Sequence, residues 1–493
     1  MLERISAMLQ SYFLVPGNFR VYPREYEIRD VSAVVLPVKG EGGCYLGIWS
    51  DRKEPLLENP LFSRFDSSSG WSFFLHAWSW ENYSVLASHL PYLRPSCFDR
   101  RSSFGCGDRL GMVSAAHITA LQKFSVFPVL AQQSPRELER THRTFRDVLL
   151  GAIWGILESG YQGSFGADAD HIKDETFLRE ARDCGFTMYT LDLSEKVDFS
   201  VLVSDPENLR ARFLNITPRE REIFKRYAGR KISLGKDFIL EFSEEKLLPI
   251  LYVYLPAIDQ VERFWYFLKD GLSDFDLEIS LDEGPTVTTP EAHFFMAQEL
   301  HERGIDFRSL APRFPGIFEK GVDYRGCLEE FISALRSHVA VQRNISGYRL
   351  SLHSGSDKLS IYPALAEETK GLFHVKTSGT SWLQALVVIA EENSELFREI
   401  YGVAFDSFEE NAKAYSLSFT RDDLPSDLES FSDALLPAVF KNEKVKQALH
   451  IAYGKVLDVL GRELRDFLFF HEEKHYQRVR ENIERHLVLL FPR

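Results

Sequence analysis

Two carboxylates and an imidazole lie within four residues in the segment GADADH, at Asp168, Asp170 and His171. The segment follows YQGSF, which is typical of a short buried strand. An acidic residue after a strand often caps the next helix, and Asp168 or Asp170 could do so. Carboxylates beside a histidine are also groups that bind divalent metals and transfer protons. The segment alone leaves the helix cap, the metal site and the proton-transfer site open.

Strand-like runs that end in polar residues recur through the middle of the chain. The eight runs lie at residues 104–112, 126–134, 163–171, 186–194, 275–284, 307–314, 348–357 and 372–380. Helix-like segments lie between them. Alternating strands and helices predict a parallel sheet, and this number of units predicts an α/β fold of the (β/α)8 TIM-barrel type. The polar residues would then meet at the carboxyl ends of the strands, where such barrels have their active sites.

The same pattern divides the chain into three parts. Residues 1–100 contain β-like runs such as VSAVVLPVKG and predict an N-terminal extension packed on the barrel. Residues 101–395 predict the barrel, with an insertion at about 196–274 that contains helical stretches. Residues 396–493 predict a mostly helical C-terminal segment.

Alternation along the strands predicts which side chains point into the barrel. In LEISLDE the leucines and the isoleucine share one face, which turns Glu278 and Asp282 inward. In LFHVKT the same argument turns His374 and Lys376 inward, and His353 shares a face with the serine two residues before it. A Glu278–Lys376 pair could be purely structural, and a single buried histidine is often only hydrogen-bonded.

Histidines from three separate strand ends, with acidic residues nearby, predict a divalent-metal site. We expect His171, His353 and His374 as ligands, and Glu278 or Asp282 could supply an oxygen ligand instead. Imidazole and carboxylate suit Zn, Mn, Fe, Co or Ni, and the sequence does not choose among them.

Composition limits the class of protein. The chain has 493 residues, 44% of them hydrophobic and 26% charged, which is ordinary for a soluble globular protein. A net charge of -14 without a basic cluster argues against nucleic acid and membrane partners, although a locally positive pocket could bind an anionic small molecule. Five scattered cysteines argue against a disulfide framework. Without a convincing signal peptide or a membrane-spanning segment, we expect a cytoplasmic protein; the oligomeric state is not predicted.

Two Gly-rich segments, SGSDK at 354–358 and TSGTS at 377–381, follow the last two runs. Barrels often bind anions at this position, and no nucleotide motif is present. We therefore expect a carboxylate or sugar hydroxyls there, with Lys376 as the positive partner and Ser354 and Asp357 as substrate-binding residues. The alternative is that both segments are turns that need small residues.

Six segments together resemble the tagaturonate epimerase (tagaturonate/fructuronate epimerase) family. They are FGCGDRLG, AQQSPRELERTHRT, GSFGADADHIK, LAPRFPGIFEKGVDY, LSLHSGSDK and HVKTSGTS, and the resemblance covers about residues 100–395. It implies a divalent-metal-dependent enzyme that interconverts D-tagaturonate and D-fructuronate in bacterial hexuronate catabolism. It also implies Asp170 as proton acceptor, Glu278 as proton donor, and His171 and His353 as metal ligands. For the third ligand we prefer His374 to Asp282.

The implied reaction constrains its mechanism, because the inverted carbon is not adjacent to the ketone. Enolisation cannot invert it, which leaves transient oxidation by NAD or retro-aldol cleavage and re-addition. The sequence has no nicotinamide fingerprint, so we expect the retro-aldol route, with the metal as Lewis acid on the ketone and the neighbouring hydroxyl. Asp170 would take the hydroxyl proton and Glu278 would return it, while Lys376 or Arg109 would hold the substrate carboxylate.

Two other functions fit the same residues. One is a metal-dependent aldolase or ketose isomerase that acts on a related sugar acid. The other is a non-catalytic sugar-acid binding protein.

Overall fold

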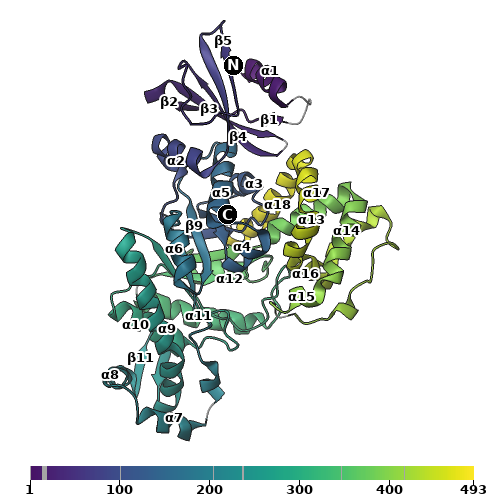
Figure 1. Ribbon diagram of the computed structural model, residues 1–493. Helices are drawn as coiled ribbons and strands as arrows, with labels where there is room; N and C mark the ends of the chain where they lie inside the picture. The colour runs from purple at the N-terminus through teal and green to yellow at the C-terminus, as the bar shows by residue number, and fades with distance from the viewer. Residues whose placement is uncertain are drawn as a thin grey trace.

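The computed structural model describes residues 2–13, 19–40, 42–99, 101–203, 205–235, 238–345, 347–415 and 417–492. At its centre is a closed barrel of parallel strands in the order β10-β13-β14-β15-β16-β7-β8-β9 (Figure 1). The strands are β7 (Ser103–Cys106), β8 (Phe127–Gln133), β9 (Gly166–Ile172), β10 (Met188–Asp192), β13 (Asp276–Ser280), β14 (Ser309–Ala311), β15 (Arg349–Leu352) and β16 (Phe373–Thr377). Each corresponds to one of the eight strand-like runs, so the predicted (β/α)8 barrel is confirmed.

Helices follow the strands in the chain and surround the barrel. They are α3 (Ser114–Leu121), α4 (Pro135–Thr141), α5 (Phe145–Ser159), α6 (Glu175–Asp183), α9 (Glu244–Gly271), α10 (Pro290–Glu302), α11 (Leu328–Ile345), α12 (Tyr362–Thr369) and α13 (Thr380–Glu392). The segment between β8 and β9 forms two helices, α4 and α5, and not one continuous helix. The break follows His142, whose φ is 51°, and α5 begins anew with a capping box between Thr144 and Asp147.

Alternation along β13 agrees with the prediction. Leu277 and Ile279 are fully buried in the apolar layer of the main core, whereas Glu278, between them, contacts residues of other barrel strands. The strand is therefore apolar towards the helices and charged towards the barrel axis.

An antiparallel sheet precedes the barrel and lies at the top of Figure 1. Its strands are β1 (Phe19–Val21), β2 (Tyr26–Ile28), β3 (Ala33–Gly40), β4 (Gly43–Ser50), β5 (Phe62–Asp66) and β6 (Trp71–Ala77); α1 (Leu2–Phe13) packs on the sheet, and α2 (Trp80–His89) follows it. Tyr26 Oη donates a hydrogen bond to the Leu157 carbonyl of α5 over 2.5 Å, so the sheet packs on the barrel helices.

The insertion between β10 and β13 contains more than the expected helices. Besides α7 (Pro206–Phe213), α8 (Pro218–Tyr227) and α9, it has a two-stranded hairpin of β11 (Arg230–Ser233) and β12 (Ile239–Phe242), which the sequence analysis did not predict. It lies at the bottom of Figure 1.

C-terminal helices complete the structure beside the barrel. They are α14 (Ser394–Asp406), α15 (Phe408–Ala412), α16 (Glu443–Ile451), α17 (Tyr453–Phe470) and α18 (Glu472–Leu490), with short 3₁₀ segments at Arg421–Asp423 and Asp433–Lys441. Because α18 packs against α3, α12 and α13, this segment covers the barrel rather than forming a separate unit.

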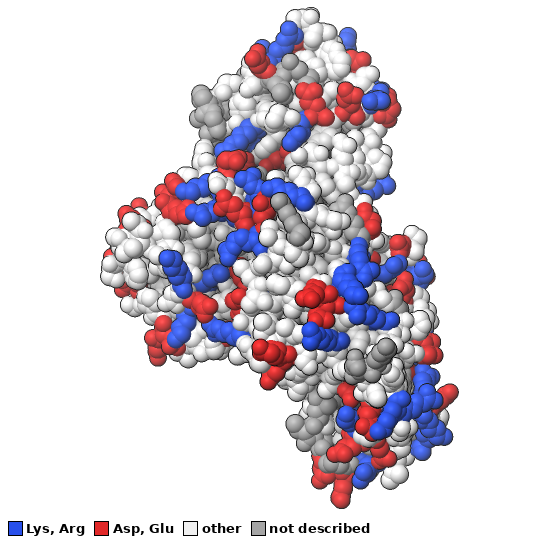
Figure 2. All heavy atoms as spheres, turned by 180° about the vertical axis from the view of Figure 1, so that it is seen from behind, with Lys and Arg blue, Asp and Glu red and all other residues white. Residues whose placement is uncertain are grey.

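The surface carries charges of both signs. In the view of Figure 2, Lys and Arg are interspersed with Asp and Glu, and the insertion, at lower right, is densely covered by both. Within the described ranges, no helix has both the length and the apolarity that a membrane crossing needs.

The burial of the apolar face of β13 predicts that a leucine on this face contributes more to stability than an exposed leucine elsewhere in the chain. Leu277→Ala removes a fully buried side chain and should lower the free energy of unfolding by about 2–5 kcal/mol. Leu214→Ala is the matched control, because Leu214 is 76% exposed and its truncation should change stability by less than about 0.5 kcal/mol. Thermal melting of the two variants against the parent tests this, and equal melting temperatures would contradict it.

Candidate active site

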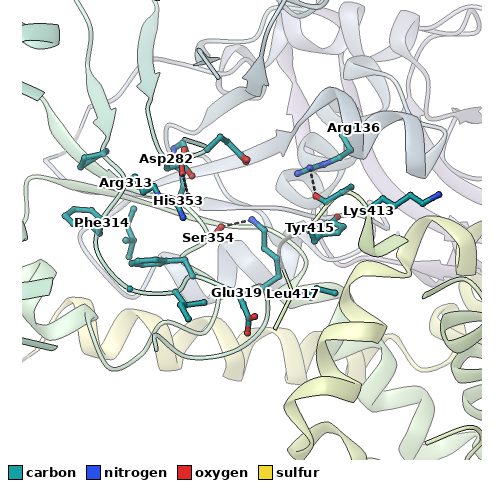
Figure 3. Close-up of a pocket in the computed structure, with 18 residues that line it drawn as sticks. Arg136, Asp282, Arg313, Phe314, Glu319, His353, Ser354, Lys413, Tyr415 and Leu417 are labelled. Atoms are coloured by element: carbon teal, nitrogen blue, oxygen red, sulfur yellow. Dashed lines mark hydrogen bonds and ion pairs between the residues drawn. The ribbon is translucent and has the colours of Figure 1, made fainter. Parts of the chain in front are cut away.

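Two adjoining cavities open at the carboxyl ends of the barrel strands. The inner cavity is lined by Gln132, Asp170, His171, Asp282, Glu283, Lys320, His353, Ser354, Lys376 and Ser378. The outer cavity has a volume of about 570 Å³ and shares Asp282, Glu283, Lys320, His353 and Ser354 with the inner one. Its remaining wall comes from the loop after β14, from Leu352, from Arg136 of α4 and from the C-terminal segment, where Lys413, Ala414, Tyr415 and Leu417 line it (Figure 3). Polar strand ends therefore meet at one site, as the barrel prediction requires.

Lys376 lines the inner cavity and lies among three carboxylates. Its ammonium nitrogen is 2.7 Å from Asp168 Oδ2, 2.7 Å from Asp170 Oδ1 and 2.8 Å from Glu278 Oε1. Burial works against its charge, but these carboxylates outweigh burial and raise the pKa of Lys376 well above its ordinary value. The expected role of Lys376 as holder of a substrate carboxylate does not fit this arrangement, since protein acids already surround its ammonium group.

The three acids differ in their surroundings. Asp170 lines the inner cavity, whereas Asp168 and Glu278 are fully buried. Burial raises the pKa of Asp168 to about 6, against the opposing effect of Lys376. For Asp170 burial also disfavours the charge, but His171 and Lys376 hold the pKa well below its ordinary value. Asp170 is thus the acid of this set that is ionised and faces the cavity.

His171, Asp282 and His353 form a group that could hold a metal ion. One ligand atom from each lies within 4.8 Å of the others. His353 Nδ1 is 2.8 Å and His171 Nε2 is 3.9 Å from Asp282 Oδ1, and the two imidazole rings are 4.9 Å apart. Burial lowers the pKa of His353, but Asp282 and Glu278 outweigh that effect and raise it to about 10. Two imidazoles and a carboxylate are a suitable donor set for the divalent metals named above.

Carboxylates orient both histidines from the side away from Asp282. His171 Nδ1 is 2.8 Å from Asp170 Oδ1, and His353 Nε2 is 2.7 Å from Glu278 Oε1. Metal-binding histidines commonly have such a partner on the second ring nitrogen. Both partner acids contact Lys376, so one lysine positions both imidazoles indirectly.

A β-bulge brings Asp170 and His171 to the same site. Neighbouring residues of a strand normally point to opposite faces. Here the pairing of β9 with β10 shifts register, so that Asp170 and His171 together lie opposite Thr190, and His171 has a φ of 53°. This bend turns both side chains towards the cavity, at the cost of about 1–3 kcal/mol of backbone strain.

His374 is not part of the ligand group. It lies two residues before Lys376 on β16, and its Nδ1 is 2.9 Å from Ser103 Oγ. Burial lowers its pKa to about 3, so it is a neutral histidine of the barrel interior. The prediction of an inward orientation is confirmed, but the geometry favours Asp282, the alternative, as the third ligand.

Arg109 and Asp357 lie outside both cavities. Arg109 is buried, with Nε 3.0 Å from Glu137 Oε1, one terminal nitrogen 3.0 Å from the His450 carbonyl, and its guanidinium 3.8 Å from the centre of the Tyr453 ring. Asp357 faces the C-terminal helices, where its Oδ2 is 3.2 Å from Lys446 Nζ. Of the expected substrate-binding residues, only Ser354 and Lys376 line a cavity.

The helix-cap interpretation of GADADH is wrong for both acids. Asp168 and Asp170 lie within β9, and the residue that caps α6 is Asp174, whose Oδ1 accepts hydrogen bonds from the Thr176 and Phe177 N–H groups. Asp168 instead pairs with Lys376 and accepts a hydrogen bond of 2.9 Å from Thr190 Oγ1.

Several residues of the site were not anticipated, among them Thr190, Lys320 and Arg136. Thr190 contacts Asp168, Glu278 and Lys376, and the alternation of MYTLD could have identified it as inward-facing. Lys320 and Arg136 line the outer cavity from a loop and from the first turn of α4. No strand periodicity marks those two positions.

Known proteins resemble the whole chain. The tagaturonate epimerase family matches residues 22–490. A tagaturonate/fructuronate epimerase of Thermotoga maritima is 43% identical over 477 residues, which cover 96% of this chain and 97% of the relative. The crystal structure of fructuronate-tagaturonate epimerase UxaE from Cohnella laeviribosi with one glycerol has a TM-score of 0.90 at 33% identity, covering 99% of each chain. The native structure of that protein has the same TM-score at 32% identity, again over 99% of each chain. The chain therefore belongs to the tagaturonate epimerase family.

Proposed function

We propose that this protein is a divalent-metal-dependent epimerase that interconverts D-tagaturonate and D-fructuronate by retro-aldol cleavage and re-addition. The observation that carries the proposal is the position of Asp170, which lines the cavity directly beside the group of His171, Asp282 and His353. Family membership supports the substrate pair, because the relatives named above are epimerases of these two sugar acids.

The donor atoms of the ligand group fit a divalent cation. They come from β9, from the residues after β13 and from the end of β15, and Asp170 and Glu278 orient the two imidazoles. When bound, the cation would supply Lewis-acid stabilisation of negative charge that develops on the substrate oxygens.

Asp170 has the position of the general base. It would take the proton from the hydroxyl on the carbon to be inverted, while the bond to the next carbon breaks and its electron pair moves into the ketone. The products are an aldehyde and an enediolate. Rotation of the aldehyde presents its opposite face, the bond re-forms, and the new alkoxide takes up a proton.

Glu278 has the role of proton donor by resemblance, and its surroundings suggest how it would act. Its Oε1 contacts Lys376 and His353, and Glu278 is not among the residues that line the two cavities. Lys376 touches both Glu278 and Asp170 and lines the inner cavity, so Glu278 would act through the ammonium group of Lys376. This group would give a proton to the alkoxide and take back the proton that Asp170 accepted.

We also propose a cytoplasmic location. All five cysteines are free thiols, which suits a reducing compartment.

Replacing Asp282 and His374 one at a time should show which of the two is a metal ligand. We expect Asp282→Ala to lose most of its bound divalent metal and its activity, because it removes one of the three donor groups. His374→Ala should keep the metal, because His374 lies outside the group. Metal analysis of the dialysed variants, with circular dichroism to verify folding, tests this.

Chelation is the control for the metal itself. Exhaustive chelation should abolish epimerisation, and re-addition of a divalent metal should restore it. Full activity of the chelated enzyme, or loss of metal in His374→Ala but not in Asp282→Ala, would contradict the assignment.

Replacement of the base should reduce turnover without unfolding the protein. We expect Asp170→Asn to lower kcat by about 10²–10⁴-fold, because the amide cannot accept the hydroxyl proton. Asp192→Asn is the matched control: Asp192 ends the neighbouring strand, both aspartates are 7% exposed, and Asp192 does not line either cavity. Wild-type turnover by Asp170→Asn in a steady-state epimerisation assay would rule out this base.

Isotope retention should identify the retro-aldol route. During turnover in deuterated water, the hydrogen on the inverted carbon stays in place, because it becomes the aldehyde hydrogen of the cleaved fragment. Mass spectrometry and NMR of the product should therefore show no deuterium on that carbon. Complete exchange there would mean direct deprotonation, and a requirement for added nicotinamide would mean transient oxidation.

A further inference from the structure

Four cationic side chains line the outer cavity without a carboxylate partner. They are Arg136, Arg313, Lys320 and Lys413. Among the described residues, none of the four has a carboxylate oxygen within 4.0 Å. In a chain with a net charge of -14, such a set makes the cavity locally positive and suited to an anion.

Three acidic residues of the same wall have other partners. Glu319 Oε2 is 2.9 Å from an Arg325 guanidinium nitrogen, and Asp282 Oδ1 is 2.8 Å from His353 Nδ1. Glu283, which lines both cavities, has Oε1 3.7 Å from His171 Nε2. Four cations therefore face three carboxylates in this wall, and no ion pair joins the two sets among the described residues.

Lys320 differs from the other three cations because it lines both cavities. Its ammonium donates a hydrogen bond of 2.6 Å to Ser354 Oγ, drawn as a dashed line in Figure 3, and Ser354 directly follows His353. Lys376 is the other lysine of the inner cavity, and it is already paired with Asp170. Lys320 is thus a cation beside the ligand group that remains free to bind a negative group.

The loop that carries Lys320 is held on both sides. The buried Lys358 donates hydrogen bonds to the carbonyls of Glu319, over 2.8 Å, and Val322, over 2.5 Å. Glu319 also accepts a hydrogen bond of 2.8 Å from the backbone N–H of Ser418. These bonds fix the backbone around Lys320, so less conformational entropy is lost when its side chain binds a ligand.

We infer that Lys320 binds the carboxylate of the substrate and thereby selects a uronate over a neutral ketose. The inference rests on the proposed function, in which the ketone end of the sugar acid lies at His171, Asp282 and His353. The carboxylate is at the far end of the same molecule and would point towards the outer cavity, where Lys320 stands at the junction. An ammonium–carboxylate hydrogen bond is among the stronger polar contacts available there.

Binding of the substrate carboxylate by Lys320, the anchor, also has a consequence for the reaction. After cleavage, the aldehyde fragment carries the carboxylate, and inversion needs only a turn about the bond between its aldehyde carbon and the next carbon. A carboxylate held by Lys320 allows this rotation and keeps the fragment in the cavity. Loss of the anchor should therefore release free aldehyde.

Three variants of the metal-loaded enzyme test the assignment: Lys320→Met, Lys320→Arg and Lys441→Met. Lys441 is the matched control, because it is an exposed lysine that lines neither cavity. We expect Lys320→Met to lower kcat/KM for D-tagaturonate by about 10- to 100-fold, mainly through KM, and to release trappable aldehyde. Lys320→Arg should recover most of the loss, and Lys441→Met should change kcat/KM by less than about twofold.

Two results would overturn the inference: a Lys320→Met variant with wild-type kcat/KM, or an equal loss in Lys441→Met. A wild-type enzyme that does not epimerise tagaturonate would instead contradict the proposed function. In that case the role of Lys320 is tested separately by calorimetric measurement of D-tagaturonate binding to the wild type and to Lys320→Met. Equal affinity would contradict binding of the carboxylate by Lys320, and weaker binding to the variant would support it.

Discussion

The ammonium group of Lys376, surrounded by Asp168, Asp170 and Glu278, is the interaction on which the site depends. Three carboxylates in a barrel interior would repel one another, and an unpaired buried charge is costly. The lysine makes the cluster stable, and through Asp170 and Glu278 it also fixes the orientation of His171 and His353. A residue that sequence reasoning assigned to the substrate is therefore the structural centre of the catalytic machinery.

The basic residues of the site fall into two groups with different tasks. Arg109 and Lys376 are buried and paired with protein acids, so their charges are balanced within the protein and do not bind a ligand carboxylate. Lys320 and Arg313 face a cavity and have no such partner among the described residues, so their charges remain for a ligand. Pairing therefore separates structural from ligand-binding cations more reliably than position at a strand end does.

The barrel and the kinds of polar residue at the carboxyl ends of its strands could be predicted from the sequence. Which of these residues contact one another could not. Periodicity identified all eight strands and turned Glu278, His374 and Lys376 inward, because alternation is a local property of extended chain. It did not distinguish His374 from Asp282 as ligand, since both point inward and only their height along the barrel axis differs. Lys320 lies on a loop without periodicity, so its place at the cavity emerges only from the tertiary structure.

The outer cavity joins parts of the chain that lie far apart in sequence. Its wall combines the loop after β14 with residues 413–415 and 417 of the C-terminal segment, while the ligand group belongs to the barrel alone. Admission of a molecule and its chemical conversion are thus assigned to different stretches of chain. Chimaeras that exchange only these two wall segments between related enzymes would change which sugar acids enter the cavity. The reaction centre itself would stay intact.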